Sequence, residues 1–176
     1  AVFALAVRPA HPQLSEDAAK HAAQEVRLLI TQGTAVTGAL QPAINSGKAS
    51  KDQVAPDVLV AQFMERYQKA AGVPLDAKAP GVIGDSRRAY VQAFRSVVTR
   101  FQSNLVKGGQ DAFVPAFFRA QTLREFNNAM GGKIQAYATN RDQELINGDW
   151  AVNQVMKGSR LAGEVARGMA TGNLDS

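Results

Sequence analysis

The sequence predicts an α+β fold that is rich in helix. Three observations support this fold class. Apolar residues recur at steps of three and four along five long segments, which is the period of an α-helix. Glycines stand where these segments end, as is usual just after a helix. Residues 133–139, Lys-Ile-Gln-Ala-Tyr-Ala-Thr, alternate by twos instead and predict a short strand.

The first helix is expected to open at Ser15-Glu16-Asp17, where a hydroxyl cap precedes acidic residues of the first turn. Pro42 should bend this helix, and Gly47 should end it. Its apolar face is a narrow seam suited to packing on another helix. The seam comprises Ala18, Ala22, Val26, Leu29, Gly33, Val36, Leu40 and Ile44.

A polar linker, 48–56, separates the first helix from a second helix at 58–71. Asp57 is positioned to cap the second helix, and Gly72 to end it. The residues expected to face inward are Phe63, Met64 and Tyr67. Two prolines and two glycines mark residues 73–84 as a loop.

Asp85 should cap a third helix, 86–106, which Gly108-Gly109 terminates. The apolar stripe of the third helix is Tyr90, Phe94, Val97, Phe101 and Leu105. A fourth helix, 112–129, follows Asp111 and ends before Gly131-Gly132. The stripe expected on the fourth helix is Phe113, Phe117, Ala120, Leu123 or Arg124, and Asn127.

A last helix is expected to start at Asn147-Gly148-Asp149 and to close at Gly172-Asn173. Its apolar face comprises Val152, Val155, Ala162, Val165 and Met169.

Composition limits the classes of function. At 176 residues, the chain has the size of one domain. Its net charge of +5 is scattered, so no nucleic-acid partner is expected. The absence of cysteine excludes disulfides, thiol nucleophiles, zinc fingers and covalently attached c-type haem.

The apolar segment 1–7 is too short to span a membrane. It is either the trimmed end of a signal peptide or anchor, or a buried N-terminal segment.

No catalytic or metal-binding signature is present in the sequence. The two histidines, His11 and His21, have no metal-ligand spacing to each other or to carboxylates. The chain has no nucleophile elbow and no glycine-rich nucleotide-binding loop. We therefore expect a protein that is not an enzyme and that carries no cofactor and no metal ion.

The aromatic segment 112–150 is the strongest candidate for a binding site, because aromatic rings beside fixed polar groups suit a small ligand. Phe117 and Phe118 lie about 100° apart on a helix, so one can belong to the core while the other lines a cavity. Arg141 is the natural partner of an anionic ligand. It could equally pair with neighbouring acids and order the turn. The predicted ligand-binding residues are Phe117, Phe118, Tyr137, Arg141 and Trp150.

The same segment resembles a bacterial family of unknown function. The resemblance rests on Phe113-Val114-Pro115-Ala116-Phe117-Phe118-Arg119, Phe126-Asn127, Gly131-Gly132-Lys133, Tyr137-Ala138-Thr139-Asn140-Arg141 and Trp150. Members of that family have a PAS-like fold behind a long N-terminal helix and serve as input domains of histidine kinases and chemoreceptors. A cyanobacterial member carries c-type haem. The resemblance implies that the helices pack on a small PAS-like antiparallel sheet.

This chain departs from the family pattern at several positions. Asp142 and Ala151 replace the family's Asn and Glu, Gly148 stands near its Asp position, and the haem-attachment motif is absent. The tail, 161–175, is similar to the end of the first helix of a HAMP signalling module. On these grounds the expected organisation is an N-terminal extension at 1–14, a sensory domain at 15–156 and a C-terminal helix extension at 157–176.

Two functions are compatible with these observations. The first is a non-enzymatic, small-molecule-sensing domain of a bacterial signalling protein, periplasmic or otherwise extracytoplasmic and anchored to the membrane in the full-length protein. Its partners would be a small-molecule ligand and a second copy of the chain or a membrane-associated protein. The second is a mostly helical structural or assembly subunit of a larger complex. A high helix content without strand favours this second function.

Overall fold

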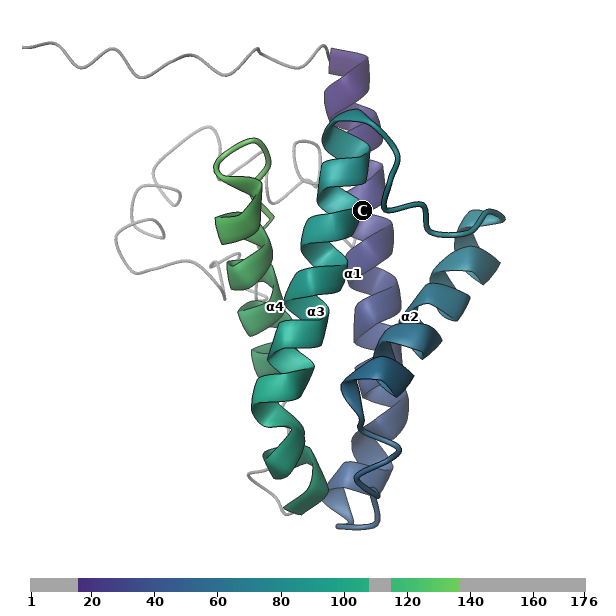
Figure 1. Ribbon diagram of the computed structural model, residues 1–176, viewed down its shortest axis with the longest axis vertical. Helices are drawn as coiled ribbons and strands as arrows, with labels where there is room; N and C mark the ends of the chain where they lie inside the picture. The colour runs from purple at the N-terminus through teal and green to yellow at the C-terminus, as the bar shows by residue number, and fades with distance from the viewer. Residues whose placement is uncertain (1–15, 108–114, 137–176) are drawn as a thin grey trace, which may run out of the picture.

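The computed structural model describes residues 16–107 and 115–136, which form four helices. They are α1 (Glu16–Asn45), α2 (Pro56–Ala71), α3 (Gly81–Lys107) and α4 (Pro115–Met130). Each helix runs opposite to the one before it (Figure 1). The helices α1 and α3 form a central pair, with α2 on one side and α4 on the other. Within the described residues, α2 and α4 do not contact each other.

The predicted α+β fold with a PAS-like antiparallel sheet is wrong for the part of the chain that the structure describes. That part is all helical and contains no strand. Residues 134–136 are irregular, and the rest of the predicted strand, 137–139, lies outside the described residues. The side-chain amide of Asn127 takes the place of a strand partner. It donates to the Ala136 carbonyl (2.9 Å) and accepts from the Ala136 N–H (2.7 Å).

The alternation of polar and apolar residues in this segment therefore does not prove a strand. Ile134 is half-buried and Ala136 is buried, while Lys133 and Gln135 are exposed. This is the pattern of a strand, but a short extended segment lying along one helix produces it equally well.

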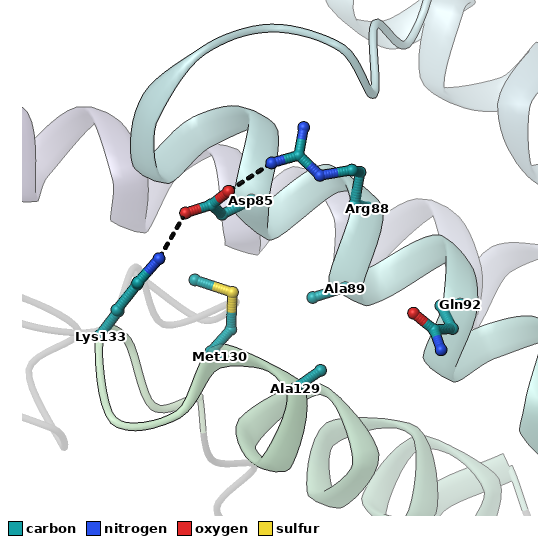
Figure 2. Close-up of a pocket in the computed structure, with 7 residues that line it drawn as sticks. All are labelled: Asp85, Arg88, Ala89, Gln92, Ala129, Met130 and Lys133. Carbon is teal, nitrogen blue, oxygen red and sulfur yellow. Dashed lines mark hydrogen bonds and ion pairs between the residues drawn. The ribbon is translucent and has the colours of Figure 1, made fainter.

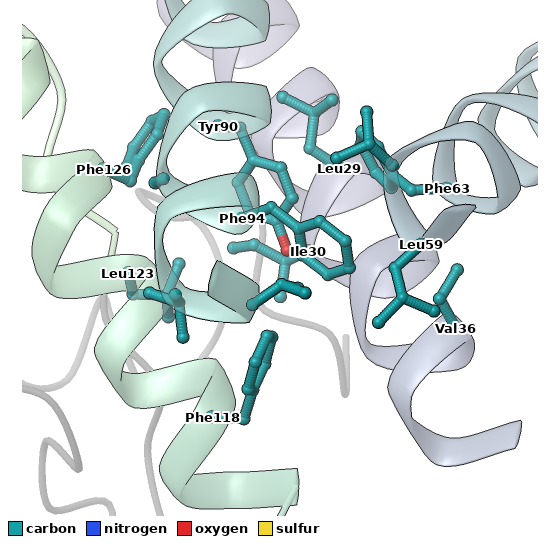
Figure 3. Close-up of a cluster of buried hydrophobic side chains, with 14 of the residues drawn as sticks. Leu29, Ile30, Val36, Leu59, Phe63, Tyr90, Phe94, Phe118, Leu123 and Phe126 are labelled. Carbon is teal, nitrogen blue, oxygen red and sulfur yellow. The ribbon is translucent and has the colours of Figure 1, made fainter. Parts of the chain in front are cut away.

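Aromatic side chains form the centre of the core, where Tyr90 and Phe94 of α3 contact aromatic rings of α2 on one side and of α4 on the other (Figure 3). The Phe63 and Phe94 rings stack at a centroid distance of 5.5 Å, and Phe118 meets Phe94 edge-on at 5.7 Å. Tyr90 lies between Phe63 and Phe126, with centroids 5.5 and 6.2 Å away. Each such pair adds about 1 kcal/mol beyond the burial of its area. The aromatic residues of three helices thus pack into one continuous cluster.

The starts of the helices differ from the sequence prediction more than their ends do. The helix α2 begins at Pro56 after Ala55, so Asp57 lies in its first turn and does not cap it. Likewise α3 begins at Gly81, which places Asp85 inside the helix. Proline fits the first helical turn, because its missing N–H would have no partner there. At the other end of α2, Gly72 adopts a left-handed φ of 73°, which confirms the predicted stop.

The faces of two helices also need correction. Met64 of α2 was expected to face inward, but it is 40% exposed. On α4 the predicted Phe117 is wrong, because it is 51% exposed and Phe118 enters the core in its place, whereas Ala120 and Leu123 are buried as predicted. The first helix agrees better: α1 continues through Pro42 to Asn45, and Gly47 follows it with a positive φ.

A polar cluster joins α1, α2 and α3, and we call it the clamp: Glu25, Tyr67 and Arg87. Arg87 donates to both carboxylate oxygens of Glu25, from Nε to Oε1 at 2.8 Å and from Nη2 to Oε2 at 3.1 Å. The Tyr67 hydroxyl donates to Glu25 (2.7 Å) and accepts from Arg87 (2.8 Å). Both charged side chains are more than four-fifths buried. The clamp is a closed set of charges and hydrogen bonds that ties the three helices together.

None of the helices in the described ranges is both long enough and apolar enough to cross a lipid bilayer.

Candidate functional site

A groove of about 260 Å³ lies between the N-terminal part of α3 and the C-terminal end of α4 (Figure 2). Its apolar lining residues are Ala89 and Met130, which are buried, and Ala129, which is exposed. Its polar lining residues are Asp85, Arg88, Gln92 and Lys133. Polar side chains beside a small apolar surface can hold and orient a small polar ligand.

Asp85 is shared by two cations from different elements. Arg88, three residues later on α3, forms an ion pair with one carboxylate oxygen. Lys133, in the turn after α4, donates to the other oxygen from Nζ at 2.8 Å. The hydrogen bond from Lys133 is the main cause that lowers the pKa of Asp85, and the nearby charges of Lys133 and Arg88 act in the same direction. Asp85 is therefore ionised at neutral pH, and the groove keeps one positive charge in excess.

Local backbone geometry holds Lys133 in this position. Gly131 and Gly132 adopt left-handed φ angles of 57° and 86°, which side chains other than glycine rarely tolerate. The Lys133 N–H then donates to the Met130 carbonyl at 3.1 Å. Beyond the turn, Asn127 fixes Ala136. The turn carrying Lys133 is thus secured to α4 at both of its ends.

The loop before α3 holds the Arg88 side chain in place. Its Nη1 donates to the Ala77 carbonyl at 2.6 Å, which ties it to the loop before α3. That loop packs closely on α3, since a Cβ on Gly84 would lie 1.6 Å from the Ala79 carbonyl oxygen. The guanidinium therefore has a fixed direction, as binding an anion through several hydrogen bonds requires.

The chemistry available in the groove is recognition of an anion. Arginine and lysine supply N–H donors, and the Gln92 amide can donate or accept a hydrogen bond. Among the described residues that line the groove there is no histidine and no hydroxyl nucleophile. Across residues 16–107 and 115–136, no group of three or more His, Asp or Glu side chains is arranged to hold a metal ion.

The structure separates the two predicted site residues that it describes. Phe118 is buried against Phe94, whereas Phe117 points outward and meets Phe101 edge-on at 5.6 Å. Neither of them lines the groove. The other predicted site residues, Tyr137, Arg141 and Trp150, lie outside the described residues.

The groove residues were assigned other roles in the sequence. The sequence pattern predicts Asp85 as a helix cap and Lys133 as the start of a strand, and it gives Arg88 no role. One signal was available, because Asp85 and Arg88 are three residues apart on a helix and can form an ion pair. Nothing in the sequence indicated that Lys133, 48 residues from Asp85, would join them.

Comparison with known proteins adds no relative. No protein-family model, no curated protein and no solved structure matches this chain. The resemblance of segment 112–150 to the PAS-like bacterial family stays a prediction, and the sheet that it implied is not found in the described residues.

Proposed function

We propose that this chain is a non-enzymatic ligand-binding domain that recognises a small anion in the groove between α3 and α4. The observation that carries the proposal is the sharing of one carboxylate, Asp85, by two cations, Arg88 and Lys133. An anion with several oxygen acceptors would satisfy the donors that a single carboxylate leaves unused.

Binding would also connect two elements that are separate in sequence. Arg88 belongs to α3, and Lys133 belongs to the turn fixed to α4. An anion bridging these two side chains stabilises the arrangement in which α4 lies close to α3. A domain of this kind transmits a signal by a shift of population between two arrangements of its helices.

Titration calorimetry of the full chain with inorganic phosphate and with succinate at low ionic strength tests the proposal. The double variant Arg88→Gln/Lys133→Gln should lose binding. Asp85→Asn should bind about fivefold more tightly, because the competing carboxylate is gone. The matched control is Arg95→Gln/Lys69→Gln, which removes the same charge from exposed ion pairs outside the groove.

Two results would contradict the groove as the site. One is unchanged binding in Arg88→Gln/Lys133→Gln. The other is an equal loss of binding in the matched control, which would show a non-specific response to net charge.

A second function, a helical assembly subunit, has two observations in its favour. The described residues are all helical and contain no strand, as expected for such a subunit. Phe117 is half exposed and rests on Phe101, so an aromatic surface lies where α3 ends and α4 begins. If this surface mediates self-association, sedimentation velocity will show a dimer that Phe117→Ser converts to a monomer. A wild-type chain that remains monomeric at high concentration would count against this function.

A further inference from the structure

A second group of polar side chains lies deep between α1, α3 and α4, separate from the groove. It occupies a crevice lined by Gly33, Thr34, Thr37, Tyr90, Phe94, Phe118, Arg119 and Thr122. In this structure the crevice has no space that admits a water molecule. Bridging water therefore cannot satisfy the polar groups in the arrangement that the structure shows.

Two buried polar atoms in the crevice have no hydrogen-bond partner: Thr34 Oγ1 and Arg119 Nε. Buried polar groups are paired in the great majority of cases, and an unpaired one costs about 1–3 kcal/mol. Two unpaired donors that line the same crevice therefore require an explanation.

Thr34 differs from the other threonines of the described helices. Thr31, Thr37, Thr99 and Thr122 each donate to a backbone carbonyl three or four residues earlier in the chain. The Thr34 hydroxyl does not, although the same bond is the usual one for a threonine inside a helix. The hydroxyl is thus available to a group inside the crevice.

Tyr90 also places a hydroxyl at the crevice. Its ring belongs to the core cluster (Figure 3), and its hydroxyl lies against Gly33, where a Cβ would be only 2.3 Å from the hydroxyl oxygen. Glycine inside a helix costs about 1 kcal/mol relative to alanine, and here it leaves the room that the hydroxyl occupies. Burial raises the pKa of Tyr90, and the charge of Arg119 acts in the opposite direction. The hydroxyl therefore keeps its proton and can donate it in a hydrogen bond.

We propose that this crevice is a second ligand site, closed in this structure, which takes a small monocarboxylate with an apolar body. Arg119, Thr34 and Tyr90 all supply donors, and a carboxylate is an acceptor with room for several hydrogen bonds on its two oxygens. The Phe94 and Phe118 rings would enclose the apolar body. Entry requires a lining side chain to move, because the crevice admits no water molecule as it stands.

Thermal unfolding of the full chain with sodium propionate or sodium benzoate, at constant ionic strength, tests the proposal. Wild type should show a saturable rise of the melting temperature within about 10 mM of either probe. Arg119→Met should abolish the rise, and Thr34→Val should weaken the apparent affinity about tenfold. Two variants serve as controls and should respond like wild type. Arg124→Met removes an exposed guanidinium from the same helix, and Thr99→Val removes an exposed hydroxyl that is bonded to a carbonyl and does not line the crevice.

The melting temperature of the ligand-free variants tests the proposal independently. Arg119→Met should unfold at a higher temperature than wild type, because it removes a buried donor that has no partner. The absence of a saturable rise with both probes, or a wild-type response in Arg119→Met, would overturn the proposal. So would a response that Arg88→Gln/Lys133→Gln abolishes and Arg119→Met retains, since the carboxylate would then bind in the groove.

Discussion

The two sides of the central α1–α3 pair both carry an arginine and a buried tyrosine, but they differ in the partners that these side chains have. On the α2 side, an arginine and a tyrosine meet a carboxylate, and the clamp of Glu25, Tyr67 and Arg87 is complete. On the α4 side, Tyr90 and Arg119 lie close together, and none of the described residues that line their crevice is a carboxylate. A complete polar network makes a region rigid, whereas the unpaired Thr34 hydroxyl and Arg119 Nε are donors that a ligand can use. We therefore propose that the α2 side supplies stability and the α4 side recognition.

The largest effect should come from opening the clamp. Arg87→Met leaves the buried Glu25 side chain without its cation, which should cost about 3 kcal/mol of the free energy of unfolding. Urea denaturation measures this loss. The control is Arg95→Met, whose ion pair with Asp57 is exposed and worth less than about 1 kcal/mol. Equal losses in the two variants would show that the clamp is no more than a surface pair.

A somewhat smaller effect should follow from raising the pH. Burial, reinforced by the hydrogen bond to Glu25, raises the pKa of Tyr67 to about 12, from 10.0 in an unfolded chain. The folded protein keeps a proton that the unfolded chain releases, so stability is full below pH 10 and falls as the pH rises towards 12. The loss should be about 2 kcal/mol.

Urea denaturation at a series of alkaline pH values checks this dependence. Tyr67→Phe should flatten the decline of the free energy of unfolding, even though it lowers stability at neutral pH. An equally steep decline in Tyr67→Phe would show that other groups cause it.

The smallest effect concerns the contact between Gly33 and Tyr90 on the α4 side. Gly33→Ala should destabilise the protein by about 1–2 kcal/mol, because the new methyl group overlaps the Tyr90 hydroxyl. Tyr90→Phe in the same chain should recover at least half of this loss in a double-mutant cycle. Gly38→Ala is the matched control, since its methyl group meets no atom within 4 Å and should stabilise α1 by up to about 1 kcal/mol. If Gly33→Ala stabilised the protein like Gly38→Ala, the close approach of Tyr90 would be refuted.

The four described helices could be predicted from the sequence because the signals for a helix lie within the segment that forms it. Apolar spacing located α1 to α4, and glycines such as Gly72 marked where helices end. Starts were missed where an aspartate was taken as the cap, because Pro56 and Gly81 begin their helices earlier. The false strand arose because a short alternating segment does not show whether its partner is a strand or a side chain such as Asn127.

The candidate sites depend on contacts that are remote in sequence and could not be predicted from spacing. Glu25 meets Arg87 across 62 residues, and Asp85 meets Lys133 across 48. The absence of a hydrogen-bond partner for the Arg119 Nε can be recognised only when every neighbouring acceptor is known. Phe117 and Phe118 were grouped as site residues, and their separation depends on which face of α4 meets the core.

The most direct test of the central claim is an NMR titration of the ¹⁵N-labelled full chain with inorganic phosphate. If the α4 side performs recognition, the amide shifts will concentrate at residues 85–92 and 129–133, while Glu25 and Tyr67 stay unchanged. Shifts centred on the clamp, or no saturable shifts at either place, would contradict the account.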